Sequence, residues 1–217
     1  MGSIEYHLGE LDIALDKDDE RRVLPDILDS DKAILDIGCG IGQSFIALDC
    51  ADRTCIGLDV DEEAVRYGIE NNNSGIQFIL SDAARIPLPS RTLNLVFSRV
   101  SLPYTNIPKV IREIRRVLRN DGRVWMTLHG KSMADRYLKE ALRIRSVKRL
   151  LHVIYILFNG YLLKYLGFVI PFINGRFESW QDTSAIKSLL IRNGFKVDVH
   201  KVGWHTVIQG ALSEKKS

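Results

Sequence analysis

Cysteine is scarce in this chain, and the few cysteines follow no pattern typical of a disulfide framework or a zinc site. The 217 residues include three cysteines, Cys39, Cys50 and Cys55, without the paired spacing of metal ligands. We therefore expect no bound metal and a reducing compartment, the cytoplasm. The N-terminal stretch is acidic and polar, so no secretory signal peptide is predicted, and no internal repeat is visible.

The charges are almost balanced in total but divide unevenly along the chain. Residues 1–130 hold 15 Lys and Arg against 21 Asp and Glu, a net charge of −6, whereas residues 131–217 hold 15 against 6, a net charge of +9. With 46% hydrophobic residues, the composition is that of a globular protein, and the length fits a single domain over 1–217. The modest net charge of +3, with few aromatics among the basic residues, argues against nucleic acid as a partner.

Short apolar runs alternate with helical patterns up to about residue 130, which predicts an α/β fold with a mostly parallel sheet. We expect an N-terminal helical segment over 1–30 and a turn at Asn120-Asp121-Gly122. The expected strands are Ala33–Ile37, Thr54–Leu58, Ile76–Leu80, Leu93–Ser98 and Arg123–Leu128, with a terminal hairpin of Phe195–Val202 and Thr206–Leu212. The expected helices are Gln43–Leu48, Asp61–Asn71, Pro108–Leu118 and Ser184–Asn193.

A glycine-rich turn follows the first strand, in the run Leu35-Asp36-Ile37-Gly38-Cys39-Gly40-Ile41-Gly42. Glycines at alternate positions let a ligand approach the backbone closely, and amides at a helix start can face it. The G-x-G-x-x-G pattern of dinucleotide sites lacks its final glycine here, which argues against a nicotinamide-dependent oxidoreductase.

Acidic residues follow the next two strands. Asp59 lies about 20 residues beyond the first glycine, where a nucleotide-binding unit places the carboxylate that binds ribose hydroxyls. Asp59 could instead cap the following helix, but Asp61 is better placed for that role. Asp82 follows the third strand and could simply cap a short helix. Taken with Asp36, these residues favour a ligand at one edge of the sheet.

This ordered set of motifs resembles the class I S-adenosylmethionine-dependent methyltransferases, of the small-molecule type related to quinone-biosynthesis enzymes. The similarity covers roughly residues 20–130 and includes Gly57-Leu58-Asp59-Val60, Ser81-Asp82-Ala83, Ile86-Pro87-Leu88-Pro89, Leu93-Asn94-Leu95-Val96-Phe97-Ser98 and the run from Glu113 to Arg123. The resemblance implies a Rossmann-like seven-stranded sheet, mostly parallel with an antiparallel terminal hairpin strand, and helices on both faces. The residues beyond the similarity predict an inserted helical cap over 131–180.

The resemblance also implies the roles of the cofactor-binding residues. The turn of Asp36, Gly38, Cys39, Gly40 and Gly42 would pass under the methionine part of S-adenosyl-L-methionine, whose product is S-adenosyl-L-homocysteine. Asp59 with Val60 would hold the ribose. Asp82 with Ala83 would contact the adenine, and the backbone at Ser98 and Arg99 would meet the methionine amino group. Where relatives often carry an aromatic or histidine pair, this chain has Ser98-Arg99-Val100-Ser101-Leu102-Pro103-Tyr104, so no substrate contact is carried over from there.

An apolar stretch, Leu150–Ile173, has one charged residue, Lys164, and follows the basic stretch Lys131–Arg149. It is long enough to be considered as a membrane span, which needs about 20 residues. Asn159, Gly160 and Pro171 argue against a span. We expect a helical lid over the active site. The alternative is peripheral contact of 131–173 with an anionic membrane. Both interpretations allow a lipophilic substrate.

His129 follows a predicted strand at the ligand edge and is the first candidate for a general base. A solvated loop histidine is almost equally compatible with this position. Candidates for the substrate pocket are Tyr6, Tyr104, Tyr137, Glu178, Trp180 and His205. The sequence therefore predicts methyl transfer to a small lipophilic acceptor, at oxygen rather than carbon or nitrogen. The alternatives are a non-catalytic cofactor-binding module and an enzyme that methylates a lipid or quinone at the membrane surface.

Overall fold

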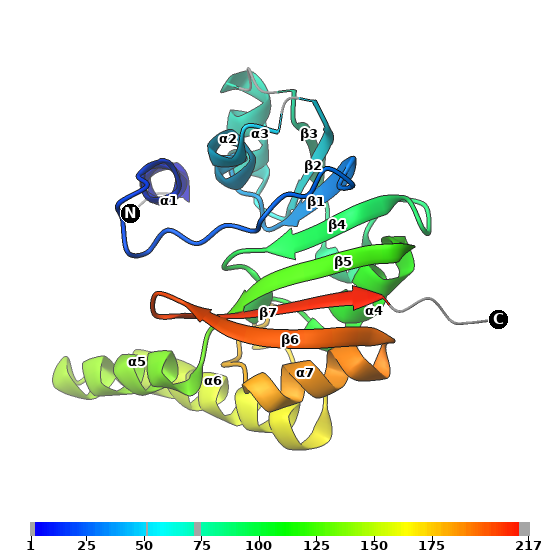
Figure 1. Cartoon of the computed structure of the whole chain (residues 1–217). Coiled ribbons are helices and arrows are strands. Elements are labelled where there is room, and N and C mark those ends of the chain that lie inside the picture. The colour runs from blue at the N-terminus through cyan, green and yellow to red at the C-terminus, as the bar shows by residue number, and fades with distance from the viewer. Residues whose placement is uncertain (1–2, 51, 72–74, 213–217) are drawn as a thin grey trace.

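The protein is built around one seven-stranded sheet with the strand order β3-β2-β1-β4-β5-β7-β6 (Figure 1). The computed structural model describes residues 3–50, 52–71 and 75–212. The first five strands are parallel, and β7 runs antiparallel between β5 and β6. The strands are β1 (Ala33–Ile37), β2 (Thr54–Asp59), β3 (Gln77–Leu80), β4 (Leu93–Ser98), β5 (Leu118–Leu128), β6 (Phe195–Val202) and β7 (His205–Leu212). The predicted Rossmann-like fold is confirmed.

Helices cover both faces of the sheet, because neighbouring residues along each strand point to opposite sides. In β1, Leu35 packs into the core that contains α4 and α7, whereas Ile34 faces Phe45 of α2 and the chain around Val23. The helices are α1 (Ser3–Leu15), α2 (Gln43–Leu48), α3 (Glu62–Asn71), α4 (Ile107–Val117), α5 (Lys131–Arg143), α6 (Val147–Leu166) and α7 (Thr183–Arg192), with short 3-10 helices η1 (Ala83–Arg85) and η2 (Leu102–Tyr104).

One local prediction differs from the structure. The N-terminal helix ends at Leu15, and residues 16–32 form no regular helix. The turn predicted at Asn120-Asp121-Gly122 falls inside the bounds of β5, at an irregularity where Leu118 pairs with Leu93 and Arg123 pairs with Leu95. An added Cβ at Gly122 would come within 3.0 Å of the Arg119 carbonyl oxygen, so the chain folds back on itself inside the strand, as the turn residues predict.

Helices α5 and α6 occupy most of the predicted cap and pack against each other beside the sheet (Figure 1). A buried asparagine, Asn159, joins α6 to the chain that returns toward α7. Its side-chain amide donates to the carbonyl oxygens of Ile170 at 3.1 Å and Glu178 at 2.9 Å, and its oxygen accepts from the Ile170 amide at 2.9 Å. Within the described residues, no helix is both long and apolar enough to cross a membrane.

Trp180 makes a second contact between α6 and the returning chain. Its ring is 5% exposed, and its Nε1 donates to the carbonyl oxygen of Leu157 at 3.1 Å. The ring lies against Gly160, where an added Cβ would come within 2.1 Å of Trp180 Nε1. Only a glycine therefore allows the helix and the indole to approach this closely.

This contact predicts a difference in stability between two Gly→Ala changes in helices. Gly160→Ala forces Trp180 away, and we expect a loss of about 1–3 kcal/mol in the free energy of unfolding, as for other overpacked cores. Gly9→Ala in α1 is the matched control, since nothing lies within 4 Å of its added Cβ. It should gain up to about 1 kcal/mol from helix propensity. Denaturant unfolding measures both; equal shifts in the two variants would contradict the packing at Gly160.

Candidate functional site

The glycine turn after β1 has a backbone that few other residues adopt. Gly38, Gly40 and Gly42 have φ angles of 75°, 54° and 90°. An added Cβ at Gly38 would come within 2.1 Å of the Ser101 Cβ, and one at Gly40 within 2.2 Å of His7 Nδ1. The turn therefore passes close beneath the loop after β4 and beneath α1, with no room for side chains.

Asp59, at the end of β2, holds this turn through its carboxylate. Its Oδ2 accepts from the Gly40 amide at 2.7 Å, and its Oδ1 accepts from the amides of Val60 at 2.7 Å and Asp61 at 3.0 Å. Asp61 itself caps α3, because its Oδ1 accepts from the Glu63 amide at 3.0 Å. As predicted, Asp61 rather than Asp59 caps the helix that follows β2.

Asp36 is the buried acid of the site. It is 1% exposed, and among the described residues its Oδ2 has no hydrogen-bond partner. Burial raises the pKa of Asp36 to about 7, although the nearby positive charge of Arg99 opposes the shift. Arg99, also buried, forms a salt bridge of 2.5 Å with Glu10, which ties α1 to the end of β4.

The ends of β1 and β4 are joined by hydroxyl groups. Ser98 Oγ lies 2.9 Å from Ser101 Oγ, and Ser101 Oγ donates to the carbonyl oxygen of Ile37 at 2.6 Å. The strand order reverses between these two strands, since β2 lies on one side of β1 and β4 on the other. Open α/β sheets bind ligands at such a switch point, outside the carboxyl ends of the strands.

Asp82 and Cys39 lie at the same edge of the sheet, at the carboxyl ends of the strands. Both side chains are in contact with neighbouring residues of the protein. Asp82 caps η1, with its Oδ1 accepting from the Ala84 amide at 2.8 Å, and Ala83 is buried beside it. Cys39 is fully buried, packs against Gly57, and has a raised pKa because of burial. Its thiol therefore faces the interior of the sheet.

A small cavity lies beyond the end of β5, against the cap. Among its lining residues are Pro103, His129, Met133, Tyr137, Glu178 and Trp180, and its volume is about 10 Å³. A space of this size holds about one water molecule. Four predicted site residues, from the chain directly after β5, from α5 and from the chain before α7, are therefore brought together here.

Tyr6 and Tyr104 belong to the same neighbourhood. Burial, Glu178, Tyr137 and Tyr6 raise the pKa of Tyr104, in that order of size. Burial also raises the pKa of Tyr6 and that of Tyr137. The pKa of Tyr6 is raised further, by a smaller amount, by the nearby Tyr137. Three tyrosines and one carboxylate from four separate segments thus lie within electrostatic range of one another.

The backbone of His129 forms two hydrogen bonds with Gln181, and the imidazole ring is partly buried. The His129 amide donates to Gln181 Oε1 at 2.7 Å, and the Gln181 amide donates to the His129 carbonyl oxygen at 2.8 Å. Its Nδ1 has no hydrogen-bond partner among the described residues. Burial, then His205 and Arg136, lower the pKa of His129 to about 4, so the ring is neutral at pH 7.

His205 does not line the cavity. Its Nε2 lies 3.1 Å from the Arg21 carbonyl oxygen, and its ring packs against Trp204 at the tip of the terminal hairpin. Trp180 lines the cavity but is held by its bond to the Leu157 carbonyl.

Sequence reasoning missed several groups that complete the site. Glu10 pairs with Arg99, Ser101 covers Gly38, Gln181 holds His129, and His152 Nε2 lies 2.8 Å from Glu178 Oε2. No motif marks them, because each contact joins segments that are distant in the chain. His152 lies within an apolar helix and offered no local signal of its own.

Comparison with known proteins connects this geometry to a family. Residues 35–126 match the family model described as a methyltransferase domain. The chain is 28% identical over 121 residues to the uncharacterized methyltransferase YcgJ of Bacillus subtilis, covering 52% of this chain and 48% of that protein. It is 30% identical over 95 residues to a fatty-acid O-methyltransferase of Mycolicibacterium smegmatis, covering 42% of this chain and 35% of the relative. The matched part thus spans less than half the length of these curated relatives.

Solved structures show the same fold. The YcgJ structure superimposes with a TM-score of 0.59 at 16% identity, covering 86% of this chain and 94% of that one. The magnesium protoporphyrin IX methyltransferase of Synechocystis, solved with bound S-adenosylhomocysteine, gives a TM-score of 0.54 at 16% identity, covering 84% and 75%. Residues 35–126 thus resemble a methyltransferase domain, and the chain shares its fold with solved methyltransferases, which together support a class I S-adenosylmethionine-dependent methyltransferase.

Proposed function

We propose that this protein transfers a methyl group from S-adenosylmethionine to an oxygen of a small lipophilic acceptor. The observation that carries the proposal is the position of two features at one edge of the sheet. The glycine turn and Asp59 lie at the ends of β1 and β2, and the aromatic cavity lies beyond the ends of β4 and β5. A donor site next to an apolar acceptor site is the arrangement that methyl transfer by proximity requires.

The residues at the strand ends have the chemistry that the cofactor needs. We propose that Gly38, Gly40 and Gly42 pass under its methionine part and that Asp59, with Val60, receives the ribose hydroxyls. The side chain of Val60 is 70% exposed beside Asp59 and offers an apolar surface. Asp82 with Ala83 would contact the adenine, and the backbone of Ser98 and Arg99 would meet the amino group.

The buried Asp36 adds negative charge beneath this site when it is ionised. When bound, S-adenosylmethionine supplies an activated methyl group on a cationic sulfur. A cation close to Asp36 would lower its pKa from about 7, so cofactor binding and loss of that proton would favour each other.

The cavity supports a lipophilic acceptor. Its walls combine apolar and aromatic side chains with a few polar groups, such as Glu178 and His129. The relative from Mycolicibacterium smegmatis is named a fatty-acid O-methyltransferase, which favours oxygen as the methylated atom. A fatty acid is already ionised at neutral pH and needs no base, whereas a hydroxyl acceptor would donate its proton, with His129 as our candidate base.

The basic and apolar residues of 131–173 bear on where in the cell the protein acts. We propose a cytoplasmic enzyme in which residues 131–173 contact a membrane peripherally, so that a lipophilic acceptor, such as a lipid or quinone, is taken from that surface. A second candidate function is a non-catalytic cofactor-binding module. It is favoured by the cavity volume of about 10 Å³, which admits no acceptor until the cap moves.

Methyl transfer itself is the direct test between these two functions. The protein is incubated with methyl-labelled S-adenosylmethionine and separate pools of fatty acids, phenols and quinols. We expect label to enter the organic phase as an ester or ether. Cofactor binding without any transfer to these pools would contradict the enzymatic proposal and favour the binding module.

Asp59→Asn tests the cofactor site. Asparagine keeps one oxygen that can accept from the Gly40 amide but removes the charge that would bind two ribose hydroxyls. Because hydrogen bonds to a charged group contribute about 1.5–3 kcal/mol, we expect affinity for S-adenosylmethionine to fall at least tenfold. Calorimetric titration measures this. Asp198→Asn on β6 removes the same charge at an exposed position and should bind like the wild type; equal affinities in all three proteins would contradict the ribose role.

The pH dependence of transfer to a hydroxyl acceptor tests His129. A base with a pKa of about 4 is neutral throughout the range above pH 5. Protonation of His129 should therefore not lower kcat/KM between about pH 8 and 5.5. A histidine with the ordinary pKa of about 6.5 would lose about tenfold in kcat/KM over that range. His129→Gln should lower kcat/KM at least tenfold without changing cofactor affinity. His200→Gln in β6 is the control, and a His129→Gln enzyme with wild-type kcat/KM would rule out the base.

A further inference from the structure

Helix α6 carries a continuous apolar stripe on its outer surface. The stripe residues recur at alternating intervals of four and three, which places them on one face of a helix. Each is between 41% and 70% exposed: Val147, Leu151, Ile154, Phe158, Tyr161 and Tyr165. The opposite face of α6 buries Val153, Ile156 and Leu163 in the protein. Helix α6 is therefore apolar on two sides, and only one of them is covered by the described residues.

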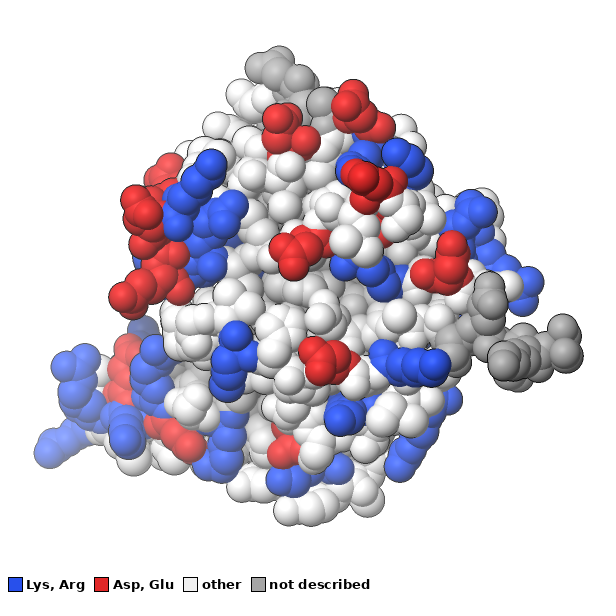
Figure 2. Space-filling view, in the orientation of Figure 1, with Lys and Arg blue, Asp and Glu red and all other residues white. Residues whose placement is uncertain are grey.

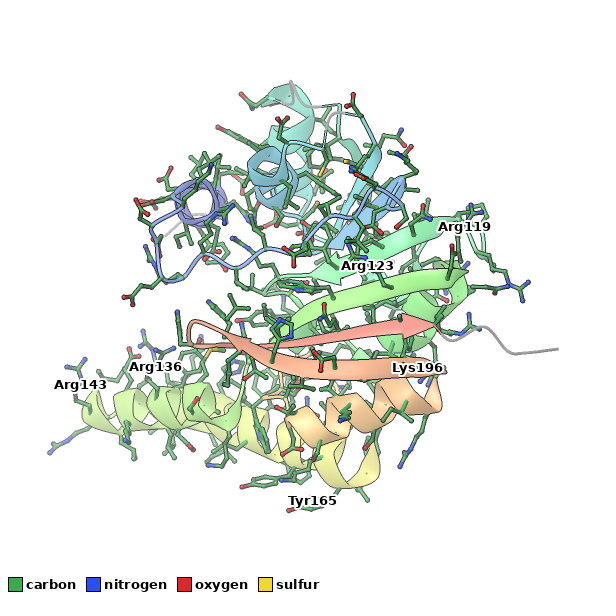
Figure 3. The ribbon with its side chains drawn as sticks, viewed as in Figure 1. Arg119, Arg123, Arg136, Arg143, Tyr165 and Lys196 are labelled. Carbon is green, nitrogen blue, oxygen red and sulfur yellow. The ribbon has the colours of Figure 1, made fainter. Side chains whose placement is uncertain are left out.

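The same apolar surface continues beyond both ends of α6. Leu142, in the last turn of α5, is 57% exposed, and Ile144, in the connection to α6, is 42% exposed. Beyond the other end of α6, Ile173 is 96% exposed. Figure 3 shows Tyr165 pointing away from the fold at its lower edge.

Positive charges surround one end of this stripe. Exposed side chains of Arg136, Lys139, Arg143, Arg145 and Lys148 form no ion pair within the described part of the chain. The nearby carboxylates are already occupied, since Asp135 pairs with Lys131 and Glu140 with Arg149. Lys and Arg side chains gather at the free end of α5 and α6, where Arg136 and Arg143 point outward (Figures 2 and 3).

Helix α6 contains no acidic residue that would oppose a negatively charged partner. Apolar and aromatic side chains next to unpaired cations form the pattern of a helix that lies in a membrane interface. The apolar groups enter the boundary of the acyl chains, while the long Lys and Arg side chains reach the lipid phosphates.

We propose that the outer face of α6, together with the α5–α6 connection, docks on the surface of an anionic lipid bilayer. The helix lies parallel to the bilayer rather than across it. This inference refines the membrane contact included in the proposed function, because it names the stripe, the cations and the lipid charge. The docking itself is independent of methyl transfer and can be measured without cofactor.

Co-sedimentation with vesicles tests the proposal. One set of vesicles contains phosphatidylcholine alone, and the other contains equal parts of phosphatidylcholine and phosphatidylglycerol. We expect the full chain to sediment with the anionic vesicles, much less with the neutral ones, and progressively less as salt is added. Protein that stays in the supernatant with anionic vesicles at low salt would overturn the proposal.

Two double variants separate the contributions of the stripe and the cations. Leu151→Gln with Phe158→Gln should weaken vesicle binding at least tenfold through lost apolar burial. Arg143→Gln with Lys148→Gln should weaken binding to anionic vesicles by about fivefold for each cation. The control is Ile69→Gln with Arg66→Gln on α3, where Ile69 is 58% exposed and Leu151 is 59% exposed. It should bind like the wild type, and an equal loss in the control would overturn the assignment to α6.

The same variants distinguish other occupants of the stripe. If the chain is a dimer that the Leu151→Gln and Phe158→Gln changes convert to a monomer, while vesicle binding is unaffected, the stripe joins two copies and the membrane proposal is wrong. Cofactor affinity is measured in parallel. Normal binding of S-adenosylmethionine without vesicle binding would reject the docking surface and the proposed membrane contact but not methyl transfer, whereas the reverse result would reject methyl transfer but not the docking surface.

Discussion

The hydrogen bond from the Gly40 amide to the Asp59 carboxylate is the interaction on which the arrangement of the site depends. It holds the glycine turn after β1 against the end of β2, at a distance of 2.7 Å. The same carboxylate accepts from two further amides, so the chain beyond β2 is fixed with the turn. The turn then lies beside β4, where Ser101 joins it through the Ile37 carbonyl. Three strand ends are thereby ordered before any ligand binds, which reduces the entropy lost on binding.

A second set of polar contacts positions the residues around the cavity that we propose for the acceptor. Gln181 holds the backbone of His129, and Asn159 joins α6 to the chain that carries Glu178. These contacts set the cap against the end of β5, where the cavity is too small for more than about one water molecule. The glycine turn is thus ordered, and the cavity that we propose for the acceptor is nearly closed. If this cavity takes the acceptor, the cap must separate from the sheet to admit it, and the outer face of the same cap carries the stripe that we assign to the membrane.

Sequence patterns predicted the sheet well because its signals are local. Apolar runs ending in glycine or aspartate mark strands, and β1 and β4 have the predicted bounds. The turn expected at Asn120-Asp121-Gly122 lies inside the bounds of β5, which no local pattern indicates, because the strand resumes its pairing with β4 on both sides of the fold-back. In the site, the three aspartates were visible from their positions inside or directly after the ends of three strands. Glu10 and His152 were not, since their partners Arg99 and Glu178 are far away in the chain and only the tertiary fold brings them together.

We propose that the carboxyl ends of β1, β2, β3 and β4 form the binding site for S-adenosylmethionine. Hydrogen exchange of the backbone amides, with and without S-adenosylhomocysteine, tests it most directly. We expect added protection in the four segments around Gly38–Gly42, Asp59–Asp61, Asp82–Ala84 and Ser98–Ser101, with little change in β6 and α7. Unchanged exchange in these segments at saturating ligand, or protection confined to other parts of the chain, would contradict it.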